Sequence, residues 1–166
     1  MRAPRRPALT LGLVAAAVLL QGCPSTYQRT YEQQTQRLEA QQRATQAQEE
    51  AAHAQAQRYA AVVYFEVGSA VVDADGQREL RWFVQQMQPF PQAVVDVQGF
   101  ADVTGSEATN EQLSQQRAAN VTSYLASQGI APSRLMTKGF GTTSPAASNA
   151  TSQGRRNNRR VEVTVR

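Results

Sequence analysis

Side chains that usually carry out catalysis or bind metals are scarce in this chain of 166 residues. Its one histidine, His53, and its one cysteine, Cys23, both lie outside the segment with folded character, so no His–Cys metal cluster or serine–histidine pair can be assembled. No glycine loop of the phosphate-binding kind is present. Asp102 and Glu107 are the nearest candidates for acid–base carboxylates, but any short polar loop contains such a pair by chance. We therefore expect no enzyme activity, no cofactor and no metal site.

Asp102 and Arg117 offer a different chemistry, the non-covalent recognition of a ligand that carries both charges. Asp102 follows an expected strand, and Arg117 lies about two turns into the next helix. Asn110, Leu113 or Ser114, and Arg117 share one helical face. If that face points back at the strand end, Arg117 comes near Asp102. The guanidinium can then grip a carboxylate through two parallel N–H bonds, Asp102 can accept from an ammonium, and the backbone N–H groups at the helix start favour the same carboxylate.

Both residues also have an ordinary structural interpretation. Asp102 opens the sequence Asp-Val-Thr-Gly, in which its side chain can bond its own turn. Arg117 can be a solvated helix residue. The residue types and their spacing leave these alternatives open.

The strand that must place Asp102 is one of four segments with a strand pattern. Val95, Val97 and Gly99 alternate with polar residues, as in a strand with one buried face. The other strand segments are residues 61–66, 134–140 and 160–166.

The helix that must carry Arg117 is the second of two. The first opens at Asp73 and has its apolar residues at helical spacing, namely Leu80, Phe83, Val84 and Met87. Pro89 and Pro91 end it. The second runs from about Thr109 to Gln128 and stops at Gly129.

The element order β-α-β-α-β-β predicts an α/β (α+β) fold over residues 59–166. In this fold, a two-layer sandwich, helices pack on a mixed sheet. The segment Gly141–Asn157 is rich in Ser, Thr, Ala and Gly, and we expect it to be a surface loop.

The first 22 residues have the layout of a secretory signal. Three arginines precede an apolar stretch, Leu9–Leu20, that is too short to span a bilayer comfortably. Gly22 and Cys23 resemble the end of a bacterial lipobox, although Gln21 departs from the small residue usually found there. The pattern predicts lipidation of Cys23. A short retained anchor and a free thiol after ordinary cleavage are the alternatives.

Residues 23–58 comprise this cysteine and a Gln/Ala-rich tether, which we expect to be partly helical because it cannot bury a core. A coiled coil is the alternative, but the stripe formed by Tyr27, Tyr31 and Leu38 fades too early to sustain heptads. A fully helical tether would reach about 50 Å. The net charge of +4 falls to +1 without the three arginines of the signal, so nucleic-acid binding has no support.

A longer motif lies between Gly99 and Ile130. Its members are Gly99, Asp102, Gly105, Asn110, Leu113, Ser114, Arg117, Ala118 and Val121. Their order and spacing resemble the core motif of the OmpA-like, peptidoglycan-associated lipoprotein family. Residues 63–66 and 158–162 resemble that family's opening and closing strands, so the likeness covers residues 59–166. Phe100 departs from the histidine common in the family, and Gly68 from a polar residue.

The resemblance implies non-catalytic binding of peptidoglycan at the diaminopimelate residue of the stem peptide. Diaminopimelate presents an ammonium and a carboxylate on one carbon, which suits one fixed anion and one fixed cation. The ligand-binding residues are then Asp102, Arg117, Asn110, Leu113, Thr104, Phe65 and Arg159.

These patterns together predict a lipoprotein that tethers the outer membrane, at its periplasmic face, to the cell wall. Pro24 follows the anchor cysteine, where the aspartate associated with inner-membrane retention is absent. The alternative is a regulatory or assembly lipoprotein that docks a periplasmic protein partner, as some relatives do in the Tol system or in secretion machines. Trp82, which lies off the apolar stripe of its helix, favours that alternative.

Replacing Cys23 by Ala is expected to move the protein from the membrane fraction to the soluble periplasm, because the acyl chains supply the membrane affinity. Fractionation after a high-salt wash measures this. A variant that stays with the membranes would instead indicate a retained Leu9–Leu20 anchor.

Overall fold

A computed structural model describes residues 25–166, and the chain divides into two compact units with a boundary between Arg43 and Ala44. The predicted signal and Cys23 lie outside the described residues. The helix α1 (Thr26–Ala56) begins in the first unit and ends in the second. It is 31 residues long, and of these only Ala56 is buried. The tether is therefore helical along this whole length, as its Ala, Gln, Glu and Arg content allows.

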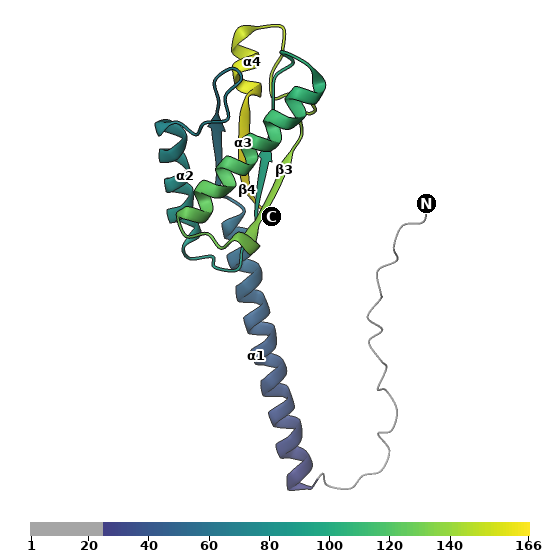
Figure 1. Ribbon diagram of the computed structural model, residues 1–166. Coiled ribbons are helices and arrows are strands. Elements are labelled where there is room, and N and C mark those ends of the chain that lie inside the picture. The colour runs from purple at the N-terminus through teal and green to yellow at the C-terminus, as the bar shows by residue number, and fades with distance from the viewer. Residues whose placement is uncertain (1–24) are drawn as a thin grey trace, which may run out of the picture. The chain divides into compact units, whose positions relative to one another are not determined.

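A four-stranded mixed sheet forms the centre of the second unit (Figure 1). Its strands are β1 (Ala60–Tyr64), β2 (Val95–Gly99), β3 (Leu135–Gly139) and β4 (Arg160–Val165). The order across the sheet is β1-β4-β2-β3. The β2–β3 pair is parallel, and β4 is antiparallel to both of its neighbours. The predicted mixed sheet with helices packed on it is confirmed.

Two helices cover one face of this sheet, α2 (Ala74–Met87) and α3 (Glu107–Ser127). Asp73 caps α2 by accepting from the Gly76 amide, as the sequence predicts for the residue that opens this helix. Ser106 caps α3 by accepting from the Thr109 amide, so this helix begins two residues before the predicted start. Among residues 25–166, no helix is long and apolar enough to cross a membrane.

The core lies between the sheet and the helices. Val95 and Val97 of β2 are fully buried, whereas Asp96 and Gln98 face the other side of the sheet. The helices contribute Leu80, Phe83, Val121 and Leu125, which are also fully buried. The predicted alternation in β2 and the predicted stripe of α2 therefore form one apolar core together with residues of α3.

One prediction about the loops is wrong. The segment Gly141–Asn157 is not loop throughout, because its last part forms the short helix α4 (Ser152–Asn158). Thr151 caps this helix, and the buried Asn158 amide bonds the backbone of Ala147 and the side chain of Asn149. Polar contacts rather than an apolar stripe hold α4, so hydrophobic periodicity does not reveal it. A single 3-10 turn, Pro132–Arg134, precedes β3.

Glycines let α3 lie directly against the strands. A Cβ on Gly99 would overlap the carbonyl oxygen of Ser114, and a Cβ on Gly139 would lie 2.6 Å from the Gln115 nitrogen. The middle of α3 therefore sits on β2 and β3 without intervening side chains. This close contact sets the position of the next turn, which carries Arg117.

Replacing Gly99 by Ala is expected to destabilise the domain by about 1–3 kcal/mol, since α3 must move off the sheet to admit one methyl group. Urea unfolding monitored by circular dichroism measures the effect. An unchanged midpoint would contradict the close packing of α3 on β2.

Candidate functional site

A cavity of about 110 Å³ lies beyond the carboxyl ends of β1 and β2. We call it the Asp102 cavity. Its lining consists of Val67, Gly68, Ala101, Asp102, Thr104, Thr109, Asn110, Leu113, Arg117 and Arg159. The structure thus brings together six of the seven residues that the sequence analysis named, with Phe65 as the exception.

Asp102 is buried, and both of its carboxylate oxygens have partners. One oxygen accepts from the Thr104 amide at 2.8 Å, which closes the local turn. The other pairs with Nη1 of Arg159 at 2.9 Å. Burial raises the pKa of the Asp102 carboxyl, but the hydrogen bonds from Arg159 and Thr104 outweigh it and leave the pKa below its usual value. Asp102 is therefore both a turn-forming residue and a fixed anion at the cavity wall.

Arg117 is completely buried and donates to three carbonyl oxygens. Nε bonds Ser69 at 2.8 Å, Nη1 bonds Phe100 at 3.0 Å and Nη2 bonds Glu66 at 3.1 Å. A guanidinium has five N–H groups, so one N–H on each terminal nitrogen is left. In the described part of the chain, Arg117 forms no ion pair with an acidic residue.

Burial, reinforced by the nearby charge of Arg159, lowers the pKa of Arg117 to about 10. Asp102 acts in the opposite direction but is the smallest of the three influences. Arg117 therefore remains a cation at neutral pH. Its desolvation costs free energy of folding, and among the described residues no carboxylate pairs directly with Arg117 to offset that cost.

Arg117 lies in the same cavity wall as Asp102, as the helical face predicts. The two residues are buried, however, and the ion-pair partner of Asp102 is Arg159. The interpretation of Arg117 as a solvated helix residue is therefore wrong. Arg159, which directly follows α4, pairs with Asp102 although it lies far from it in the sequence. Arg117 instead donates to carbonyl groups in the loops that follow β1 and β2.

Phe65 supports the cavity without lining it. Its carbonyl oxygen accepts from Nε of Arg159 at 2.9 Å, and its ring lies 5.2 Å from the guanidinium carbon of Arg117. Phe65 thus contacts both arginines from behind and fixes their separation, which makes it a positioning residue.

The face of α3 supplies a further unsatisfied group. Asn110 is only 4% exposed, and its side-chain amide has no hydrogen-bond partner within residues 25–166, although it lines the cavity. Its amide atoms are not themselves fully buried, so they can bond a ligand in the cavity. The neighbouring Ser114 is occupied, because its hydroxyl donates to Glu111 and accepts from the Gly141 amide.

The two departures from the family motif have different consequences. Phe100 points away from the cavity, since its ring stacks on Phe140 at 5.4 Å and lies under the Arg160 guanidinium at 4.0 Å. Gly68 does line the cavity, with a positive φ of 69° and open space around it. The two departures from the family motif therefore leave its charged residues, Asp102 and Arg117, as they are in the family.

The lining of the cavity therefore includes two guanidinium groups, one carboxylate and the free amide of Asn110. This arrangement has an excess of one positive charge and suits a ligand that carries a carboxylate. Among residues 25–166, no group of three or more His, Cys, Asp or Glu side chains could hold a metal ion. Sequence reasoning missed Val67 and Ala101 as lining residues, because backbone direction rather than residue type places them there.

Comparisons of the sequence with known proteins agree on one family. The sequence matches the OmpA family over residues 64–159. The probable lipoprotein YiaD of Escherichia coli is 41% identical over 103 residues, which is 62% of this chain and 47% of that protein. The peptidoglycan-binding protein ArfA of Mycobacterium tuberculosis is 42% identical over 98 residues, 59% of this chain and 30% of that protein. This chain thus spans less than half the length of these two relatives.

A solved structure gives the same fold. The crystal structure of the peptidoglycan-associated lipoprotein from Burkholderia pseudomallei matches with a TM-score of 0.61 and 26% sequence identity. The match covers 64% of this chain and 90% of that one.

Replacing Asp102 by Asn is expected to destabilise the fold at neutral pH by about 3 kcal/mol, because Arg159 loses its buried anion. Folding lowers the pKa of Asp102, so as the pH falls the unfolded chain binds the proton at a higher pH than the folded chain does. The contribution of Asp102 to stability is therefore complete above the usual pKa of an aspartate, 3.8, and is lost as the pH falls through the lower pKa of the folded state. Urea midpoints of both proteins should converge in acid. A difference that is constant with pH would contradict the ion pair.

Proposed function

This chain belongs to the OmpA family, and on that premise we propose that it binds peptidoglycan non-covalently through the Asp102 cavity, without catalysing a reaction on it. Two relatives support the proposal through their names, the peptidoglycan-binding protein ArfA and the peptidoglycan-associated lipoprotein. The recognised group is the zwitterionic end of diaminopimelate in the stem peptide, which presents an ammonium and a carboxylate on one carbon.

The observation that carries this proposal is the state of Arg117. It is a buried cation whose protein partners are all neutral carbonyl groups. A ligand carboxylate would accept the remaining N–H groups of Arg117 and hydrogen bonds from the Asn110 amide, which supplies the missing negative charge. Asp102 would accept from the ammonium through lone pairs that Thr104 and Arg159 leave free.

The volume of the cavity agrees with this ligand. About 110 Å³ is well below the roughly 300–1,000 Å³ of cavities that enclose whole small molecules. The Asp102 cavity therefore admits the end of one side chain and leaves the glycan and the rest of the peptide outside. Leu113, which also lines it, supplies an apolar contact for the methylene groups of that side chain.

The remainder of the chain would act as an anchor and a spacer. In this proposal residues 1–22 are a signal peptide, Cys23 is lipidated, and the protein lies at the periplasmic face of the outer membrane. The part of α1 that lies in the first unit, residues 26–43, would act as a spacer of roughly 27 Å between the lipid and the domain. Many such tethers acting on one continuous polymer hold membrane and wall together by avidity rather than by the affinity of a single site.

A second candidate function is the docking of a periplasmic protein partner, for example a component of a Tol-like or secretion system. The observation that favours it is Trp82, which is 44% exposed on the outer side of α2. The two functions do not exclude each other, because Trp82 does not line the Asp102 cavity.

Sacculi that contain diaminopimelate are expected to retain the protein about ten- to hundredfold better than sacculi that contain lysine in its place. Lysine lacks the distal carboxylate, so the charge-assisted bonds to Arg117 are lost. Co-sedimentation of the unmodified protein measures this without any risk of unfolding, and free diaminopimelate should compete. Equal retention on both kinds of wall would contradict the proposal.

A pair of variants then tests the arginine itself. Arg117→Lys keeps the charge but loses the two-pronged geometry, so it should bind diaminopimelate sacculi weakly. Arg156→Lys is the matched control, since Arg156 is exposed and lies outside the cavity. Melting curves establish that both variants are folded. Normal binding by a folded Arg117→Lys protein would show that Arg117 does not bind the ligand.

A further inference from the structure

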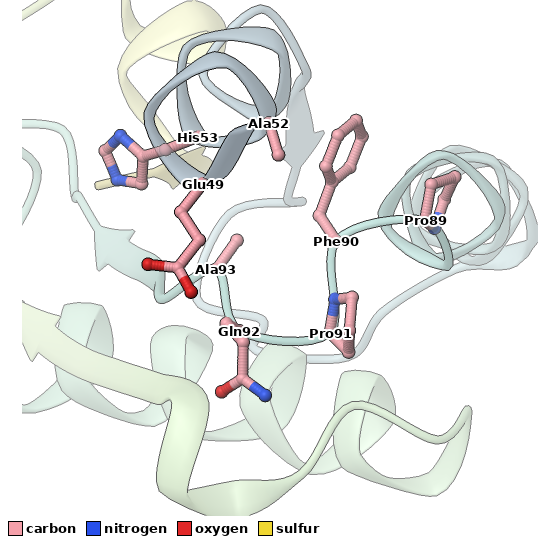
Figure 2. Close-up of a pocket in the computed structure, with 8 residues that line it drawn as sticks. All are labelled: Glu49, Ala52, His53, Pro89, Phe90, Pro91, Gln92 and Ala93. Atoms are coloured by element: carbon pink, nitrogen blue, oxygen red, sulfur yellow. The ribbon is translucent and has the colours of Figure 1, made fainter. Parts of the chain in front are cut away.

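A second cavity, of about 540 Å³, lies at the other end of the sheet, next to the residues that precede β2. Figure 2 shows its lining residues. We call it the Phe90 cavity. Residues 89–93, which form one wall, directly precede β2, whereas Asp102 follows it. The opposite wall is the end of α1. The lining consists of Glu49, Ala52, His53, Pro89, Phe90, Pro91, Gln92 and Ala93, none of which lines the Asp102 cavity.

The proline-containing wall is held rigidly. Arg134 donates from Nε to the Ala93 carbonyl at 2.7 Å and from Nη2 to the Phe90 carbonyl at 2.9 Å. The Ala93 amide closes the turn by donating to the Phe90 carbonyl. Proline at positions 89 and 91 fixes two further φ angles. This wall is therefore formed before any ligand arrives.

The helical wall is attached to the same domain. Ala56, one turn beyond His53, is fully buried in the core. His53 contacts the main-chain oxygen of Arg166 through Nε2, and the Arg166 amide donates to the Val94 carbonyl. The last turns of α1 are thereby fixed beside residues 89–93, and the imidazole nitrogen that faces Arg166 is already occupied.

The chemistry of the cavity is apolar with one charge. Phe90, the two prolines and the two alanines supply carbon surface. Glu49 forms no ion pair or hydrogen bond with any residue in the described part of the chain. Its carboxylate points from α1 across the cavity toward Gln92 and Ala93 (Figure 2). The cavity thus combines an apolar floor with an unpaired anion at its edge.

Aromatic side chains extend this surface beyond the cavity. The ring of Tyr59 lies 6.0 Å from that of Phe90 and 6.2 Å from that of Trp82. Tyr59 is partly buried and Trp82 is 44% exposed. An exposed aromatic ring beside a preformed pocket is typical of places where a few large side chains supply most of the binding energy.

We propose that the Phe90 cavity docks a protein segment that presents an aliphatic or aromatic side chain next to a lysine or arginine. The apolar side chain would fill the space between Phe90 and Ala52, and the cation would pair with Glu49. Because the two cavities lie at opposite ends of the sheet and share no lining residue, a partner and the cell wall can be bound at the same time.

Three capped tripeptides serve as probes: acetyl-Lys-Leu-Lys-amide, acetyl-Glu-Leu-Glu-amide and acetyl-Lys-Gly-Lys-amide. The full chain bearing Cys23→Ala is used so that no lipid is attached. Titration calorimetry should show saturable binding of the Lys-Leu-Lys peptide and weaker binding of the other two. Trp82, the only tryptophan, gives a second readout by fluorescence. Equal binding of the acidic peptide, or no binding of Lys-Leu-Lys, would overturn the proposal.

Matched variants locate the binding. Glu49→Gln is expected to weaken binding of the Lys-Leu-Lys peptide about two- to fivefold, the effect of one exposed ion pair. Glu50→Gln, at the neighbouring exposed glutamate outside the lining, should leave it unchanged. Ala52→Leu should weaken it strongly, because the larger side chain occupies the space opposite Phe90. Equal effects of the two glutamate variants, or normal binding by Ala52→Leu, would overturn the proposal. Retention on sacculi should be unchanged in all three, so a failure at the Asp102 cavity is separately visible.

Discussion

The architecture of the Asp102 end of the domain depends on the burial of one guanidinium group. Arg117 joins the carbonyl groups of Glu66, Ser69 and Phe100, so the chain that follows β1 and the chain that follows β2 are bound to the same helix residue. Burying an arginine without a carboxylate is expensive, and the three carbonyl oxygens offset only part of that cost. The loops are held in place by a group that still lacks a counter-charge.

This incomplete compensation connects folding with binding. A residue that served stability alone would be paired fully within the protein, as Asp102 is with Thr104 and Arg159. Arg117 and Asn110 instead retain unused hydrogen-bond donors at a small cavity. A ligand carboxylate that completes both groups would bind to an already ordered site, so little conformational entropy is lost on binding.

Local patterns in the sequence predicted the parts of this structure that depend on local physics. The alternation in β2, the Asp73 cap and the stop at Gly129 follow from neighbouring residues, and the structure has all three. The partner of Asp102 could not be found in this way, because Arg159 lies 57 residues further along the chain. Four residues of the motif, Asp102, Asn110, Leu113 and Arg117, nevertheless line one cavity, since helical periodicity places the last three on one face of α3.

The order of the elements also decides how tension between an anchored tether and a bound wall would pass through the domain. The last turns of α1 contact the domain through Ala56 and His53, and only residues 57–59 separate α1 from the edge strand β1, so tension would enter at the end of the sheet where β1 begins. The Asp102 cavity lies beyond the far end of that strand. The load therefore runs along the strands, and the ladder bonds between β1 and β4, which run across them, resist it together. The Asp102–Arg159 pair joins the segment after β2 to the residue before β4 at the loaded end. The ion pair that shapes the cavity thereby also strengthens the sheet where a ligand would pull on it.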